Sequence, residues 1–156
     1  MRVAPRAPTT AGRRPSPCLA AMTIEKLKPE TMPPTHGWPQ VTIATGTRLV
    51  FTSGQVGQDA DEKMVAGPDD YAGQMRQAML NAYAGIAAAG GGPEDVVRLM
   101  IYVVDPTPAN LEQVYAGFGN ALGEVGAKPS GMTLIGVSGL SDLDHKVEVD
   151  MTAVLG

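Results

Sequence analysis

Hydrophobic residues in two segments of the chain recur with the period of an α-helix. In the first, apolar residues three and four positions apart predict an amphipathic helix from Asp70 onward, with Asp69 and Asp70 suited to its first turn. Its stripe consists of Tyr71, Met75, Ala78, Met79, Ala82 and Ile86, and three glycines at 90–92 end it. A second helix is expected to begin at Thr107 as N-cap and Pro108 as first helical residue. Its stripe consists of Leu111, Val114, Tyr115, Phe118 and Leu122, and residues 123–129 are expected to form a loop.

Alternating or β-branched runs predict five strands. They are expected at residues 40–44, 48–53, 95–104, 132–137 and 146–154, and an acidic loop is expected at 54–69. In the last run, the apolar residues 147, 149, 151 and 153 share one face of the strand. The other face carries Lys146, Glu148, Asp150 and Thr152.

The resulting order of elements is β-β-α-β-α-β-β. Two helices cannot cover both faces of a sheet of this size, so both should pack on one face and give an α+β sandwich. The opposite face is either solvated or covered by another subunit. The run from Leu99 to Val104 is apolar on both sides, which favours a second subunit.

Composition narrows the classes of function. The 156 residues suit one domain, and no run of about 18 apolar residues predicts a membrane span. A net charge of −4 and an aromatic content of 4% argue against nucleic-acid and membrane surfaces. The chain has one cysteine, Cys18, and two histidines, His36 and His145, so neither a disulfide nor a metal or other cofactor is expected. His145 stands with Asp142 and Asp144 in what we interpret as a solvated turn.

Residues 1–21 differ from the rest because they hold four arginines, several prolines and no acid. A secretory signal would need an apolar run that is absent here, and a transit peptide would need an amphipathic helix that proline breaks. We favour a disordered tail, or an upstream start with the functional start at Met22. The expected domain is 22–156, which contains 16 acidic and 8 basic residues. The expected location is cytoplasmic.

Four segments, taken in order, resemble the RidA (YjgF) family. They are the SGQ sequence within 51–56, the Q-x-x-Q-x-x-x-N helix at 74–81, the D-V-V-R strand that begins at Asp95, and the V-E-V-D sequence at 147–150. The resemblance extends over roughly residues 36–155. It implies a chorismate-mutase-like fold and a homotrimer with clefts for small ligands between its subunits. It also implies hydrolysis of the reactive enamines and imines that pyridoxal-phosphate enzymes produce.

The chain departs from this family at one position of the site. Active members carry a P-A-R-S-x-V sequence whose arginine binds the substrate carboxylate with its two-pronged guanidinium. Here the matching stretch is 129–134, and Gly131 stands at the arginine position. One extra residue follows near Ile135 and Gly136. The chain is therefore similar to Rid subgroups that lack the arginine.

The resemblance assigns the remaining site residues one by one. Glu148 matches the glutamate that positions the attacking water, although it could instead form an ion pair with Lys146. Trp38 stands where the family has a cleft tyrosine, and Glu112 where it has an asparagine. Either could instead have no role in a site. Ser53 is expected at the edge of the site, as a strand-end hydrogen-bonding residue rather than a catalyst. Backbone N–H groups near Met132 and Thr133 are expected to hold a carboxylate or carbonyl oxygen.

Three functions remain open. The first is hydrolysis of a small imine, enamine or related carbonyl compound at a site without the arginine. The second is non-catalytic binding of small metabolites by a trimer. The third is cleavage of RNA, which the acidic domain disfavours because phosphate contacts require clustered cations.

Overall fold

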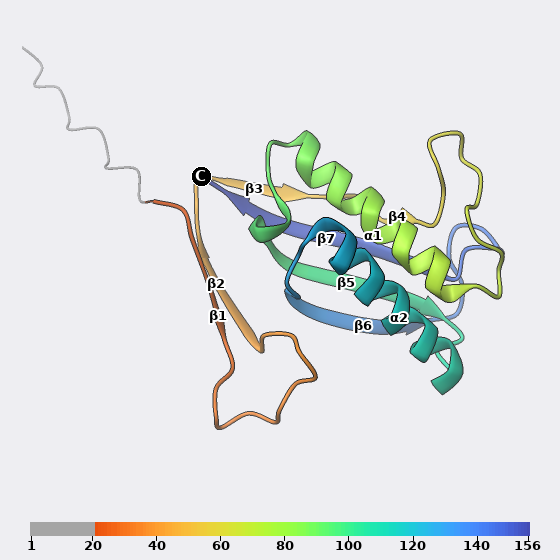
Figure 1. Ribbon diagram of the computed structural model, residues 1–156, viewed down its shortest axis with the longest axis horizontal. Helices are drawn as coiled ribbons and strands as arrows, with labels where there is room; N and C mark the ends of the chain where they lie inside the picture. Colours follow the sequence, from red (N-terminus) through yellow and green to blue (C-terminus); the bar gives the residue numbers. More distant parts are fainter. Residues whose placement is uncertain (1–20) are drawn as a thin grey trace, which may run out of the picture.

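The computed structural model describes residues 21–156, in which two helices lie side by side on one face of a sheet (Figure 1). The strands are β1 (Thr23–Leu27), β2 (Val41–Thr45), β3 (Arg48–Phe51), β4 (Gln55–Val56), β5 (Val96–Val104), β6 (Gly131–Val137) and β7 (Val147–Leu155). The helices are α1 (Tyr71–Ala88) and α2 (Pro108–Val125), with a short 3₁₀ helix at Pro93–Asp95. The predicted α+β fold is confirmed. The prediction of a disordered tail falls on residues outside the described part of the chain.

The main sheet has the strand order β3-β7-β5-β6, and β4 continues the edge beside β7. Only β5 and β6 are parallel, because α2 connects them as a crossover. Their register places Gly131 beside Arg98 and Thr133 beside Met100. Strand β7 runs antiparallel to β5 and places Glu148 beside Tyr102. These pairings decide which side chains meet on the face of the sheet that the helices leave uncovered, here called the open face.

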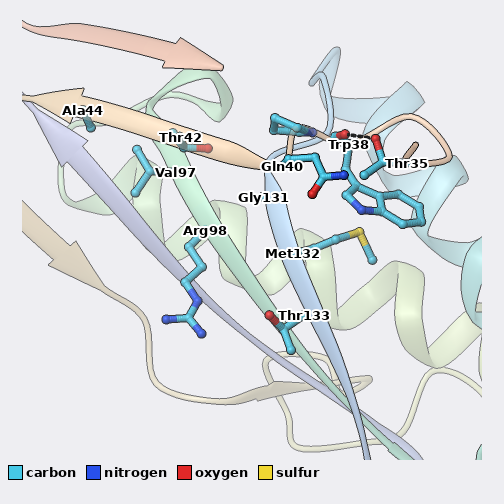
Figure 2. A pocket seen from close by; sticks show the side chains of 11 residues that line it. Thr35, Trp38, Gln40, Thr42, Ala44, Val97, Arg98, Gly131, Met132 and Thr133 are labelled. Carbon is cyan, nitrogen blue, oxygen red and sulfur yellow. Dashed lines mark hydrogen bonds between the residues drawn. The ribbon is translucent and has the colours of Figure 1, made fainter. Parts of the chain in front are cut away.

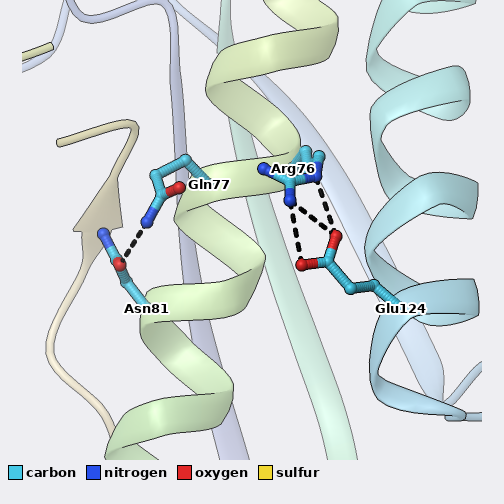
Figure 3. A network of polar contacts seen from close by, with 4 residues as sticks. All are labelled: Arg76, Gln77, Asn81 and Glu124. Carbon is cyan, nitrogen blue, oxygen red and sulfur yellow. Dashed lines mark hydrogen bonds and ion pairs between the residues drawn. The ribbon is translucent and has the colours of Figure 1, made fainter. Parts of the chain in front are cut away.

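The core lies between the helices and the sheet. The helix-facing side chains of β7 are fully buried or nearly so, as the alternation predicted. They are Val147, Val149, Met151 and Ala153. Met75, Met79 and Ile86 of α1 are buried against this layer. Arg76 of α1 and Glu124 of α2 add a two-pronged ion pair between the helices, with a shortest distance of 2.6 Å (Figure 3).

The helix ends differ slightly from the prediction. Thr107 caps α2 as expected, accepting a hydrogen bond from the backbone N–H of Asn110. Asp70 is the N-cap of α1 rather than part of its first turn. Helix α2 continues to Val125, so the loop predicted at 123–129 was wrong for its first three residues. Glu124 in the extra turn pairs with Arg76, and Gly126 then ends the helix in the left-handed region at φ 68°.

Strands β1 and β2 form a separate antiparallel hairpin that extends away from the main sheet (Figure 1). Strand β1 was not predicted, because Glu25, Lys26 and Lys28 dilute its apolar pattern. The predicted strand 48–53 ends at Phe51, and β4 follows where a loop was expected. Thr52, between β3 and β4, is hydrogen-bonded to β7. Its hydroxyl accepts a hydrogen bond from the backbone N–H of Met151 at 2.9 Å. The loop expected at 54–69 therefore starts with two residues of sheet.

Amide side chains of α1, of which Gln74 is fully buried, tie the loops to this helix. Gln74 donates to the carbonyls of Gly67 (3.0 Å) and Asp144 (2.9 Å) and accepts from the N–H of Lys146 (2.8 Å). Asn81 donates to the carbonyls of Val56 (3.0 Å) and Gln58 (2.8 Å). The side chain of Gln77 donates only to Asn81, one turn away on the same helix (Figure 3). The Q-x-x-Q-x-x-x-N sequence is therefore structural here.

His145 corrects the interpretation of residues 138–145 as a solvated turn. His145 is only 7% exposed. Its Nε2 atom lies 3.1 Å from Gln58 Nε2, and its Nδ1 atom lies 3.2 Å from Ser141 Oγ. The neighbouring Asp142 and Asp144 are exposed, as a solvated turn would have them. The buried histidine thus links two loops through its side chain. Composition alone did not distinguish this histidine from a surface residue.

Candidate ligand-binding cleft

A cleft of about 450 Å³ lies between the β1–β2 hairpin and the first residues of β5 and β6 (Figure 2). Three parts of the chain line it: residues 35–44, the start of β5 and the start of β6. The lining residues are Thr35, Trp38, Pro39, Gln40, Thr42, Ala44, Val97, Arg98, Gly131, Met132 and Thr133. The hairpin thus forms one wall of the cleft and the main sheet forms the other.

Local hydrogen bonds fix the wall that carries Trp38. The Thr35 hydroxyl donates to the Trp38 carbonyl at 2.5 Å, and the Gln40 amide donates to the carbonyl of Pro33. The His36 ring meets the indole edge to face at 6.0 Å between centroids. Along β2 the side chains alternate, so Thr42 and Ala44 face the cleft while Ile43 is exposed on the far side.

Gly131 leaves a gap in the opposite wall. A Cβ atom at this position would lie 3.5 Å from Thr42 Oγ1 and 3.6 Å from the Val97 carbonyl, which are ordinary contact distances. Its φ is not in the left-handed region. The glycine is therefore not required by a turn or a close approach. Its effect is to leave space between Thr42 and the start of β6.

The cleft lining carries a single charged side chain, Arg98. Parallel register places Arg98 directly beside Gly131, so its side chain leaves the sheet on the same face. Thr42 contributes a different feature: its Oγ1 is buried and has no hydrogen-bond partner within residues 21–156. The wall around Gly131 thus combines one cation with one unpaired hydroxyl.

Glu148 lies in another part of the open face. Its carboxylate occupies the space above Gly54, where a Cβ atom would fall within 1.7 Å of Glu148 Oε1. Neighbouring Tyr102 donates its hydroxyl to Asp150 Oδ2 at 3.0 Å. This hydrogen bond raises the pKa of Tyr102 above its ordinary value; burial and the charges of Asp150 and Glu148 act in the same direction, and the charge of Arg98 opposes them. Glu148, Asp150 and Tyr102 therefore form one acidic cluster, separate from the cleft.

The predicted site residues divide into three groups. Trp38, Gly131, Met132 and Thr133 come together in the cleft. Ser53 is exposed next to Gly54, and its carbonyl accepts a hydrogen bond from the Gln55 side chain at 3.2 Å, so it belongs with Glu148. Glu112 is exposed on α2, in the helix layer on the other side of the sheet. One protomer therefore does not bring Glu112 to its own cleft.

Seven of the eleven lining residues were not predicted from the sequence, among them Arg98 and Thr42. For Arg98, the β5-α2-β6 order predicts that β5 and β6 are parallel neighbours, but only their register in the structure aligns Arg98 with Gly131. No signal in the sequence identifies Thr42, because its position depends on how the hairpin is placed beside the first residues of β5 and β6. Among residues 21–156, no three histidine, cysteine or carboxylate side chains gather as metal ligands would.

Comparison with known proteins identifies the family. The family model described as Endoribonuclease L-PSP matches residues 29–155. The structure of YyfB from Yersinia pestis, a Rid-family protein of unknown function, is 32% identical and covers 85% of this chain and 98% of its own, with a TM-score of 0.75. This chain belongs to the Rid family.

Two further Rid-like structures come from E. coli. YjgF is 27% identical and covers 69% of this chain and 81% of its own, with a TM-score of 0.61. TdcF, solved with bound serine, is 24% identical over the same shares, also with a TM-score of 0.61, and is similar in fold. In this Rid chain Gly54, the glycine of the SGQ sequence, makes room for the Glu148 carboxylate. No helix within residues 21–156 has the length and apolar character of a membrane span.

Proposed function

We propose that this Rid protein binds small reactive metabolites in the cleft beneath the hairpin and hydrolyses imines or enamines there. The observation that carries the proposal is the convergence of Trp38 with Gly131, Met132 and Thr133, which stand more than 90 positions later in the chain. A volume of about 450 Å³ suits a small metabolite. The E. coli protein TdcF was solved with bound serine, a ligand of this size class.

Hydrolysis needs a base, and Glu148 is the candidate. A water oxygen would bond to the imine carbon while a carboxylate takes one proton of the water and returns it to the nitrogen. As the C–N bond breaks, the new hydroxyl passes its proton to the nitrogen, so that ammonia leaves and the carbonyl compound remains. Glu148 lies beside Tyr102, four residues and about 13 Å along β5 from Arg98. A ligand in the cleft of one protomer is thus remote from that protomer's own Glu148, so turnover would depend on subunit assembly.

We propose a homotrimer as that assembly. Leu49 and Phe51 on β3 are 65% and 69% exposed, and both share the open face with the partly exposed Ile135 of β6. Exposed apolar side chains on an uncovered sheet face favour contact with another chain. A second subunit could also bring its Glu112 to a cleft that it cannot reach within its own protomer.

The oligomer is tested by sedimentation equilibrium at micromolar concentration. We expect the native protein to sediment as a trimer and Phe51→Glu as a smaller species with native helix content. Leu143→Glu is the matched control, because Leu143 is 89% exposed in the loop before β7 and should remain trimeric. A native protein that is monomeric at every concentration would remove the support for a shared site.

Binding is tested through Trp38, the only tryptophan of the chain. We expect 2-oxobutanoate or 2-butanone to change its fluorescence saturably, and 2-iminobutanoate to disappear faster in the presence of the protein. Glu148→Gln should abolish turnover and leave the fluorescence response intact. A fluorescence response without turnover would favour the alternative, a non-catalytic binding protein. A silent Trp38 with every probe would contradict the cleft as the ligand site.

Although the family model is described as an endoribonuclease, we do not propose RNA cleavage. RNA binding requires several cations along the path of the phosphates. The cleft offers Arg98 alone, and the adjacent open face carries Glu148 and Asp150.

A further inference from the structure

A second cavity, here called the lysine cavity, lies on the same face of the hairpin as the cleft, beside strand β1. Antiparallel register pairs Ile24 with Ala44 and Lys26 with Thr42, so these four side chains leave the hairpin on one face. Thr42 and Ala44 line the cleft, whereas Ile24 and Lys26 line the lysine cavity, which has a volume of about 420 Å³. Its opposite wall consists of Pro93, Glu94 and residues 125–128, and none of its lining residues belongs to the cleft.

Two lysines meet in the lysine cavity. Lys26 comes from β1, and Lys128 comes from the loop between α2 and β6. Burial and the positive charge of Lys128 both lower the pKa of Lys26 below its ordinary value, so the two ammonium groups are close enough to repel each other. Residues 22–156 contain 8 basic and 16 acidic side chains, so two neighbouring cations in this domain call for an explanation.

No acidic side chain compensates these two charges. Within residues 21–156 neither lysine forms an ion pair, and Lys26 Nζ donates to the uncharged carbonyl of Pro129 at 3.1 Å. Glu94 borders the lysine cavity, but its carboxylate lies toward Gly92, where a Cβ atom would fall 2.5 Å from Glu94 Oε2. A cation can also be held by the carbonyls at the end of a helix, yet in the described part of the chain neither lysine donates to the last turn of α2.

The rest of the lysine cavity is mainly apolar and is lined by Ile24, Pro93, Val125 and Ala127. Such a surface gains free energy when it covers a hydrocarbon chain or ring. The two ammonium groups suit an oxyanion. A phosphate monoester carries a charge of about −2 at neutral pH, and its oxygens can contact two ammonium groups at once.

We propose that Lys26 and Lys128 bind the phosphate group of a small phosphate monoester whose apolar body lies against Ile24 and Val125. The ammonium group of a lysine has three N–H donors, and the Pro129 carbonyl uses one donor of Lys26. Phosphate binding therefore does not require that hydrogen bond to break. Because the lysine cavity is separate from the cleft, this inference goes beyond the proposed function and does not depend on it.

The experiment measures the affinity of the full chain for hexyl phosphate, for the neutral hexan-1-ol and for inorganic phosphate by calorimetry. We expect Lys26→Gln and Lys128→Gln each to weaken hexyl phosphate binding about tenfold, because each removes a charged contact to the phosphate. Hexan-1-ol should bind more weakly than hexyl phosphate to the native protein and equally to all variants. Inorganic phosphate should also bind about tenfold more weakly than hexyl phosphate, because it has no apolar body to bury.

Lys28→Gln is the matched control, because Lys28 is an exposed lysine just after β1 that does not line the lysine cavity. It should bind hexyl phosphate within about twofold of the native affinity, since it removes the same charge from outside the site. Lys26→Arg should keep most of the affinity, because the positive charge is retained.

The absence of any heat of binding with hexyl phosphate, or an equal loss of affinity in Lys28→Gln and Lys26→Gln, would overturn the site. Hexanoate binding as tightly as hexyl phosphate would overturn the phosphate assignment, and inorganic phosphate binding as tightly would overturn the role of the apolar wall. Lys128→Gln should leave the Trp38 fluorescence response to 2-oxobutanoate unchanged, so the proposed function and this inference can fail independently.

Discussion

The two faces of the main sheet have opposite roles, although the same strands build both. Along β7, Val149 and Met151 are buried against the helices, while Glu148 and Asp150 between them lie on the open face. The helix-covered face contains no charged side chain of β7, and the open face contains all of them. Because successive side chains of a strand point to opposite faces, the residues that stabilise the fold and the residues available for chemistry lie on different faces of the sheet. Substitutions on one face should change folding, and those on the other should change binding or assembly.

The largest expected effect comes from truncating the covered face. Ile101→Ala removes a fully buried side chain from the middle of β5 and should lower the free energy of unfolding by about 2–5 kcal/mol. Thr133→Ala, on the exposed face of neighbouring β6, should change it by less than about 0.5 kcal/mol. Chemical denaturation at fixed protein concentration measures both. Equal losses for the two variants would show that the open face is as important to folding as the covered one.

A smaller loss of stability is expected from removing a polar side chain that links loops to α1. Gln74→Ala leaves the Lys146 N–H and the carbonyls of Gly67 and Asp144 without their partner and should cost about 1–3 kcal/mol. Gln77→Ala is the control, because its amide contacts only Asn81 and should cost much less. If Gln74→Ala is as stable as Gln77→Ala, the loops do not depend on that side chain.

The covered face was predictable from the sequence and the open face only in part. Helix stripes and the alternation of β7 depend on local spacing, so most residues that pack together could be named in advance. The exception is Tyr115 of the predicted α2 stripe, which is 44% exposed. The β1 strand and the position of Thr42 depend on long-range folding of a hairpin with weak local pattern. His145 was misread because burial of a polar residue depends on distant partners such as Gln58. The cleft residues found early came from the family resemblance, whereas Arg98 required the register of β5 and β6.

Adding a cation to the cleft sharpens the separation of the two faces. A Cβ atom at position 131 meets only ordinary contacts, so the backbone there accepts a side chain. Gly131→Arg should raise the affinity for 2-oxobutanoate about tenfold, or 1.4 kcal/mol, because the guanidinium adds a two-pronged contact to the carboxylate. Calorimetry of Gly131→Arg against the native protein measures the gain, and chemical denaturation shows whether the variant is folded. A folded variant without any gain would mean that position 131 does not face the bound ligand.

Only a small change in stability is expected at Gly54, where the test concerns the position of Glu148. An alanine Cβ would collide with the end of the Glu148 side chain, and a flexible carboxylate can turn aside without moving the backbone. Gly54→Ala should therefore cost less than about 1 kcal/mol in unfolding while displacing the carboxylate. Imine turnover should fall as far as in Glu148→Gln, with the Trp38 fluorescence response to 2-oxobutanoate unchanged. Gly139→Ala is the control, because a Cβ at Gly139 meets no atom within 4 Å. Full turnover in a folded Gly54→Ala protein would show that hydrolysis does not require the carboxylate where the structure places it.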